Sequence, residues 1–359
     1  NLRNDIGKFQ FSGPYRDVLF TNYTEKAISL YEKLMAPLEA FNLPKKLTII
    51  PGGVLGYLPF DALLTSAPNK TCTFQHYPYL VRKHSLSFGY SATLQYALSQ
   101  NKINSNRIFA GFAPEFQGLG GFDALNFNIE GLESIKPIVK GDLFLGSEAT
   151  LENFKEYVSQ YGIIQLATHA EANTSTGDFS FIVFADGKGG YDSLFVKDLY
   201  LLDLMAEMVV LSACETAVGK LHKGEGIISL ARGFLQSGAQ SVVTTLWSIN
   251  DETNKLLMQE FYKQIKKGKS KDEALQLAKV KQIENADQMY AHPVFWAAFA
   301  PMGDMKAIYP GVQPVMLYLG GIFLVLLLIF LFGFRHKPIA KSGIIRKIIQ
   351  QKPWSKVGL

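Results

Sequence analysis

Two stretches of the chain decide the fold: Ile163-Ile-Gln-Leu-Ala-Thr-His-Ala170 and Met208-Val-Val-Leu-Ser-Ala-Cys-Glu-Thr216. Each begins as an apolar run of strand length and ends at one reactive side chain, His169 in the first and Cys214 in the second. In a parallel α/β sheet, the carboxyl ends of neighbouring strands open into the same crevice. An imidazole and a thiol that meet there are the minimum equipment for a cysteine nucleophile with a histidine partner.

The residues alone also leave a plainer interpretation open. A cysteine after a buried strand is more often a small core residue than a nucleophile, and a single histidine is often a hydrogen-bonded structural residue. The small neighbours Ala167, Ala170 and Ala213 favour the catalytic interpretation, because they leave room for a substrate backbone. At this point the two interpretations stand side by side.

Strands and helices alternate on both sides of these stretches. We expect strands at 47–50, 108–112, 143–145, 181–184 and 241–247, and helices at 24–41, 151–161, 227–236 and 251–266. A further helix is expected after Ser270-Lys-Asp-Glu273, which has the spacing of a capping box. The alternation predicts parallel β-α-β units, and therefore an α/β fold with a mostly parallel sheet flanked by helices.

Composition excludes several classes of function. The formal charge of +5 comes from residues 335–359, which hold seven Lys or Arg and no acidic residue. The remaining 29 basic and 31 acidic residues nearly cancel, so we expect no nucleic-acid partner. Only two cysteines, Cys72 and Cys214, are present, and the six histidines are scattered. We therefore expect neither a disulfide framework nor a metal site.

A hydrophobic segment lies near the C-terminus. Val315 to Phe334 holds no charged residue, and a bilayer core of about 30 Å needs about 20 helical residues, so we predict one transmembrane helix there. The basic block at 335–359 follows at once, and the positive-inside rule places this tail in the cytoplasm. Residues 1–314 would then lie outside the cytoplasm, anchored to the inner membrane. The need to keep a thiol reduced favours the alternative, a cytoplasm-facing tail anchor.

The stretch from Leu211 to Trp247, reading LSACETAVG and then GEGIISLARGFLQSGAQSVVTTLW, resembles the CHAT domain, a family grouped with the caspases and separases. Further matching stretches are Leu58-Pro-Phe-Asp61, Gly146-Ser-Glu-Ala-Thr150, Ala167-Thr-His-Ala170, Asp251-Glu-Thr253 and His292-Pro-Val-Phe-Trp296. The similarity covers roughly residues 25–304 in a consistent order.

This resemblance implies a caspase-like sheet, with a pseudo-catalytic half at 1–140 and a catalytic half at 141–305. It makes His169 the catalytic histidine and Cys214 the nucleophile of a cysteine endopeptidase without a cofactor. The backbone N–H groups of Ala170 and Cys214 are the expected donors to the oxyanion. Family members often carry tetratricopeptide repeats before this domain. Because the chain opens at Asn1 without Met, we expect a preceding sensor module that controls cleavage of a protein partner.

The expected substrate pocket is formed by Glu215, Trp247 and Asp251. If both carboxylates face it, the pocket favours Arg or Lys before the cut bond. The alternative is that Asp251 caps the helix that follows it. Two other functions remain open: a non-catalytic scaffold of the same fold tethered to the membrane, and a thiol-dependent acyl transferase.

Overall fold

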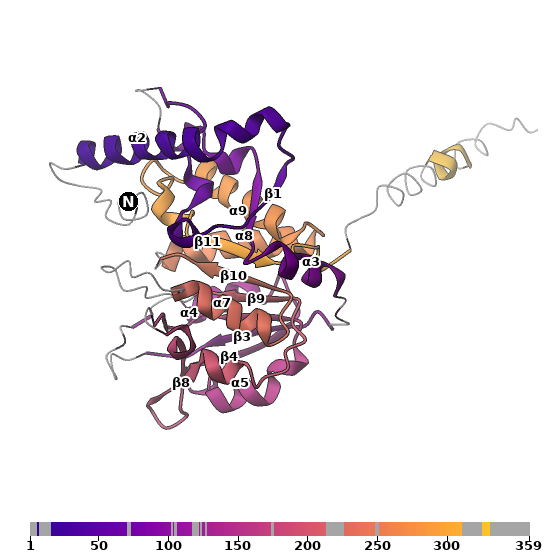
Figure 1. The fold of residues 1–359 in the computed structure, drawn as a ribbon. Helices are drawn as coiled ribbons and strands as arrows, with labels where there is room; N and C mark the ends of the chain where they lie inside the picture. The colour runs from indigo at the N-terminus through magenta and orange to yellow at the C-terminus, as the bar shows by residue number, and fades with distance from the viewer. Residues whose placement is uncertain are drawn as a thin grey trace, which may run out of the picture. The chain divides into compact units, whose positions relative to one another are not determined.

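A mostly parallel sheet of eight strands is the centre of the fold in the part of the chain that we describe (Figure 1), in the order β1-β2-β11-β10-β9-β5-β3-β4. The computed structural model describes residues 6, 16–69, 73–101, 103, 106–116, 122, 124–125, 128–173, 176–212, 226–247, 251–310 and 325–330. The strands are β1 Lys46–Ile49, β2 Ser85–Phe88, β3 Phe109–Ala113, β4 Gly141–Leu145, β5 Ile163–Leu166, β9 Met208–Leu211, β10 Ser241–Thr245 and β11 Phe299–Gly303. The α/β class and the mostly parallel sheet predicted from the sequence are confirmed.

The sheet consists of two parallel blocks. Strands β4, β3, β5, β9 and β10 run in one direction. Strands β11, β2 and β1 run in the other, because β11 pairs antiparallel with β10 and parallel with β2. The seam between β10 and β11 therefore joins the block that contains β5 and β9 to strands from both ends of Asn1–Gly311, which is the first of the two units of the chain. The assignment of 1–140 and 141–305 as pseudo-catalytic and catalytic halves stays a prediction.

Helices flank the sheet, and a small antiparallel sheet adjoins it. The helices are α2 Arg16–Leu34, α3 Ala92–Gln100, α4 Asn128–Ile135, α5 Leu151–Tyr157, α6 Val196–Leu199, α7 Gly226–Gln236, α8 Asp251–Lys266 and α9 Lys271–Asn285. The small sheet has the order β6-β7-β8, with β6 Ala170–Glu171, β7 Phe181–Ala185 and β8 Tyr191–Phe195. Strand β6 begins one residue after His169, so the small sheet grows directly from the candidate site.

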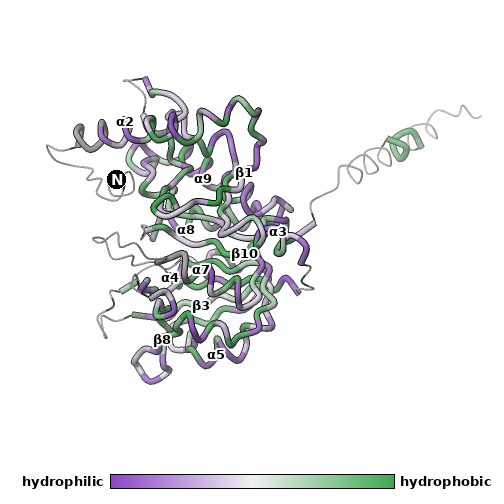
Figure 2. Tube along the Cα trace, in the orientation of Figure 1, coloured by the Kyte–Doolittle hydropathy of each residue, from purple (hydrophilic) through white to green (hydrophobic). Residues whose placement is uncertain are grey.

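Burial explains the central strands. Every residue of β5, β9 and β10 is buried, as expected for strands covered on both faces by helices. Hydrophobic stretches (green) run through the middle of the first unit in Figure 2. Strand β11 was not predicted from the sequence. Its stretch Phe299-Ala-Pro-Met-Gly303 carries Pro301 in its interior, where proline removes a ladder donor. Pairing with β10 and β2 overrides that local signal.

Two helix predictions differ from the structure. The helix expected at 24–41 is α2, which ends at Leu34, followed by a 3₁₀ helix at Ala36–Phe41. Pro37 near the start of the second segment explains the break, because proline has no N–H for an α-helical bond. The capping box at Ser270 was wrong, since its side chain makes no cap bond to α9. Its hydroxyl accepts from the Lys46 ammonium instead.

A buried ion pair joins α9 to the N-terminal part of the first unit. The Lys279 Nζ lies 2.7 Å from Asp61 Oδ2 and donates to the carbonyl of Phe299 in β11 at 2.6 Å. Both charged residues are buried, at 1% and 4% exposure. Asp61 ends the Leu58-Pro-Phe-Asp61 stretch that resembles the family, so the structure gives that stretch a packing role.

Replacing Lys279 with Met should lower the free energy of unfolding by about 3–5 kcal/mol, because Asp61 is left as a buried charge without its partner. Urea unfolding of the full chain measures this. The double variant with Lys279→Met and Asp61→Leu should regain much of the loss, since neither buried charge remains. A Lys279→Met variant as stable as the wild type would contradict the structural role of the pair.

A second buried link is His292, which precedes the 3₁₀ helix Pro293–Phe295. Its Nδ1 accepts the N–H of Val294, and its ring packs edge-on against Phe74 at 4.8 Å and tilted against Tyr23 at 5.8 Å. Burial lowers the pKa of His292 from 6.5 to about 3, because a charged imidazolium there would lose its hydration. The native protein therefore keeps this ring neutral.

Stability should fall as the pH drops below 6.5, because the unfolded chain then binds a proton at His292 and the native chain does not until about pH 3. The loss between pH 7 and pH 5 from this residue is about 2 kcal/mol. Urea unfolding of the wild type and of a His292→Asn variant at both pH values isolates the contribution of His292. Asn can still accept from Val294 but does not titrate. Identical pH dependence in the two proteins would refute the assignment.

The segment Val312–Leu359 forms a second unit, described here by itself. Within it, residues 325–330 are helical and their side chains are exposed. Across the described residues we find no helix with the length and apolar character needed to cross a membrane. The predicted span Val315–Phe334 lies outside those residues except for 325–330, and so does the tail at 335–359.

Candidate active site

Strands β5 and β9 carry the two reactive stretches side by side. They pair in parallel through four aligned pairs, from Ile163↔Met208 to Leu166↔Leu211. The ladder continues one step further, because the N–H of Ser212 donates to the Leu166 carbonyl at 3.0 Å. Strand β3 lies on the other side of β5, and the N–H of Ala167 donates to Phe112 at 2.9 Å. The ends of three parallel strands are therefore fixed at one edge of the sheet.

His169 lies three residues beyond the end of β5 and is 3% exposed. Its carbonyl accepts the N–H of Val183 in β7 at 2.9 Å. The hydroxyl of the preceding Thr168 donates to the carbonyl of the same Val183 at 2.5 Å. The backbone at the histidine is thus held at the junction of the large sheet and the small one.

Ala170 pairs with Ile182 in the antiparallel β6–β7 ladder. The bond from Val183 to His169 marks the preceding pair as hydrogen-bonded, so Ala170↔Ile182 is the non-hydrogen-bonded kind. The N–H of Ala170 is consequently directed away from β7. The role of this N–H as an oxyanion donor stays a prediction.

Aromatic rings surround the imidazole of His169. Phe116 meets it edge-on with ring centroids 4.5 Å apart, and Phe122 stacks on it at 5.3 Å with an interplanar angle of 26°. Tyr191, the first residue of β8, stacks on Phe116 at 5.0 Å and meets Phe122 edge-on at 6.0 Å. We call Phe116, Phe122 and Tyr191 the aromatic cluster. The sequence did not lead us to predict this cluster. The phenylalanine residues in the stretch that follows β3 were the feature that could have indicated it.

Two amides brace the ends of the strands below the histidine. The Asn128 side chain at the start of α4 donates to the carbonyls of Pro114 and Ala167, at 2.8 and 3.2 Å. Gln165 in β5 donates to the Ser212 hydroxyl at 3.1 Å. The buried carboxamide oxygens of Gln165 and Asn254 have no hydrogen-bond partner among the described residues. They line a cavity of about 30 Å³, which has room for a water molecule.

The other predicted site residues have different outcomes. Cys214 and Glu215 lie outside the described residues. Trp247 is buried, and its indole N–H donates to the Val294 carbonyl at 2.9 Å. Asp251 is the first residue of α8, whereas an N-cap residue precedes the helix, so the capping role of Asp251 stays a prediction. The substrate pocket therefore remains a prediction.

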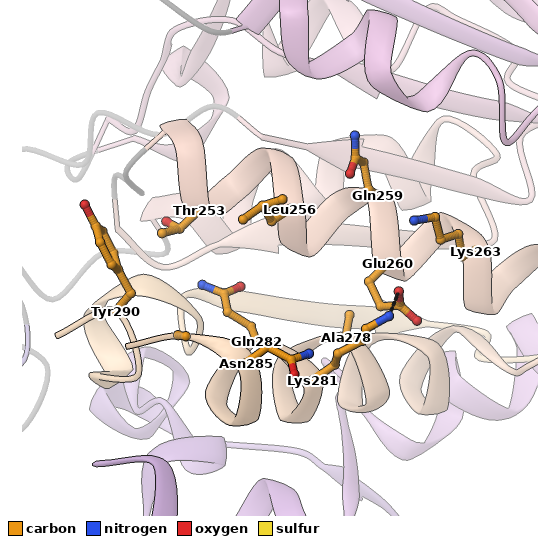
Figure 3. A pocket seen from close by; sticks show the side chains of 11 residues that line it. Thr253, Leu256, Gln259, Glu260, Lys263, Ala278, Lys281, Gln282, Asn285 and Tyr290 are labelled. Atoms are coloured by element: carbon orange, nitrogen blue, oxygen red, sulfur yellow. Dashed lines mark hydrogen bonds and ion pairs between the residues drawn. The ribbon is translucent and has the colours of Figure 1, made fainter. Parts of the chain in front are cut away.

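A larger cavity of about 290 Å³ lies between α8 and α9 (Figure 3). Side chains from both helices point into it, and the Glu260–Lys281 ion pair, at 2.6 Å, crosses it. None of the predicted site residues lines it. Within the described residues, no group of three or more His, Cys, Asp or Glu side chains is placed to hold a metal ion.

Comparison with known families and proteins gives matches over most of the chain. The model of the family described as "CHAT domain" matches residues 24–304. Tetratricopeptide repeat protein 28 from Mus musculus is 24% identical over 341 residues, which is 79% of this chain and 13% of that protein. Its Homo sapiens counterpart is 30% identical over 118 residues, 33% of this chain and 5% of the human protein. The chain thus spans only a small fraction of these relatives.

Solved structures show weaker similarity. The Saccharomyces cerevisiae separase–securin complex matches with a TM-score of 0.47 and 13% identity, covering 71% of this chain and 15% of that chain. The Arg-specific cysteine proteinase gingipain R matches with a TM-score of 0.46 and 7% identity, covering 85% of this chain and 74% of that chain.

Proposed function

Because the chain belongs to the CHAT domain family, we propose that it is a cysteine peptidase that cuts a protein partner with His169 and Cys214. The register of β5 and β9 carries this proposal. Every aligned pair of the two strands joins residues 45 positions apart, as in Leu166↔Leu211, and the same interval separates His169 from Cys214. Neighbouring strands lie about 4.8 Å apart, so a cysteine that keeps this register comes within reach of the imidazole.

The proposed reaction follows from those two groups. The imidazole takes the thiol proton, and the thiolate sulfur bonds to the carbonyl carbon of the substrate. The C–N bond then breaks, and the imidazolium gives its proton to the leaving amine. Water next attacks the thioester carbonyl carbon and gives one proton to the imidazole. The C–S bond breaks, the imidazolium returns that proton to the thiolate, and the new carboxylic acid loses its proton to solvent. The N–H groups of Ala170 and Cys214 are the proposed donors to the oxyanion.

The specificity pocket and the control of cleavage are part of the same proposal. Carboxylates of Glu215 and Asp251 facing the pocket beside Trp247 would favour Arg or Lys before the cut bond. The relatives are named for tetratricopeptide repeats, which supports an upstream repeat module that senses a signal and directs the peptidase to its partner.

One observation favours a second function. His169 is 3% exposed and packs against Phe116 and Phe122, as expected of a residue in a closed site. A non-catalytic scaffold of the CHAT fold, which binds partners and cuts none, is therefore the alternative.

Labelling of Cys214 separates the two functions. A set of peptidyl chloromethyl ketones with Arg, Leu or Phe next to the reactive group should add one equivalent to Cys214, detected by mass spectrometry of the full chain. His169→Ala should slow labelling by about 100-fold or more, because the general base is lost. His76→Ala, an exposed histidine outside the site, is the matched control. A folded wild type that leaves Cys214 unmodified would favour the scaffold.

We also propose that Val315–Phe334 anchors the chain in the inner membrane, with the peptidase domain outside the cytoplasm and the basic tail at 335–359 inside. The uncharged segment followed by seven Lys or Arg supports this arrangement. The full chain should stay in the membrane pellet after carbonate extraction, and a chain ending at Gly311 should not. Protease added to intact spheroplasts should digest the large domain; protection of that domain would favour the cytoplasm-facing anchor.

A further inference from the structure

The order of the strands fixes the direction in which a substrate crosses the proposed site, on which this inference rests. The relevant order is β10-β9-β5-β3, with Cys214 following β9 and His169 following β5. The thiol bonds to the carbonyl carbon, whereas the imidazole protonates the leaving amine. The acyl side of the substrate therefore lies toward β9 and β10. The residue after the cut bond passes over β5 toward β3.

The aromatic cluster occupies that leaving side. Phe116 follows β3 by three residues and is 4% exposed, so it forms the floor next to the imidazole. Phe122 and Tyr191 are partly exposed and form the accessible surface. Every member contacts at least one other ring, and two of them contact the His169 ring. The His169 imidazole, which delivers the proton in the proposed reaction, and the aromatic cluster, which meets the leaving residue, thus pack together.

We infer that the aromatic cluster is the subsite for the residue immediately after the cut bond, and that this residue is apolar or aromatic. Phenyl and phenol rings bind another ring favourably by stacking, and they bind an aliphatic side chain by burying its apolar surface. A carboxylate in the same place loses water and gains no donor from Phe116 or Phe122, so the Tyr191 hydroxyl is the one donor that the three rings offer it. A side chain that fills the subsite also packs against Phe122, which stacks on the His169 imidazole. The leaving residue is thereby held next to the group that protonates its amine.

Cleavage of a peptide library provides the first test. The full chain is incubated with proteome-derived peptides whose amines are blocked, and the first residue of each new amino terminus is counted. We expect Phe, Tyr, Leu and Met to be enriched about tenfold over Asp and Glu. Phe122→Ala should reduce that ratio to near that of unselected peptides, and Phe122→Tyr should restore it. Tyr96→Ala, an exposed aromatic residue on α3, is the matched control. An unchanged ratio in Phe122→Ala would overturn the subsite.

Binding of small amides provides a test that needs no peptidase activity. A Cys214→Ala chain with isotope-labelled histidine is titrated with phenylalaninamide or the α-amide of aspartic acid, and the His169 ring signals are followed by NMR. The affinity of phenylalaninamide, taken from the change in these signals, should be at least tenfold higher than that of the aspartyl amide. Phe122→Ala should abolish the change. If Cys214 resists labelling while the amide binds, the peptidase proposal fails, and the aromatic cluster is a binding site for apolar residues without a role in cleavage. If Cys214 is labelled and neither amide shifts the ring, the subsite is wrong.

Discussion

The parallel pairing of β5 with β9 is the constraint on which the candidate site depends. Four aligned pairs lock one strand against the other, and a slip by one residue would turn every buried side chain of β5 to the opposite face. Because all the residues of both strands are buried, such a slip is costly. The ends of both strands, from which the chain continues to His169 and Cys214, are therefore set by the buried core.

Tertiary contacts then hold the edge of the sheet where these strands end. Asn128 ties the ends of β3 and β5 together through two carbonyls, and Thr168 and His169 both bond to Val183 of the small sheet. The histidine backbone is thereby fixed from two directions. Proton transfer requires such positioning, because a small displacement of the base costs much of the rate.

Buried charges serve the fold away from this edge. Lys279 and Asp61 connect α9, the N-terminal segment and β11, which is the strand at the antiparallel seam. A buried ion pair adds little to stability over a well-packed apolar pair, but removing one partner is costly. The Leu58-Pro-Phe-Asp61 and His292-Pro-Val-Phe-Trp296 stretches resemble the family at a distance from the reactive residues. Their contacts join the segment that contains α9 and β11 to the N-terminal segment, which gives both stretches a packing role.

The sequence by itself determined the α/β class, the strands around both reactive residues and the candidate histidine, because apolar runs and the residues that end them are local properties. It did not determine β11, whose Pro301 contradicts strand propensity. It also did not determine the start of α9, where the Ser270 hydroxyl accepts a hydrogen bond from Lys46 of the distant strand β1. Only the tertiary structure decided that Phe116 and Phe122 lie against His169. Their contact depends on β3 being the neighbour of β5, and strand order is a long-range property that no local pattern encodes.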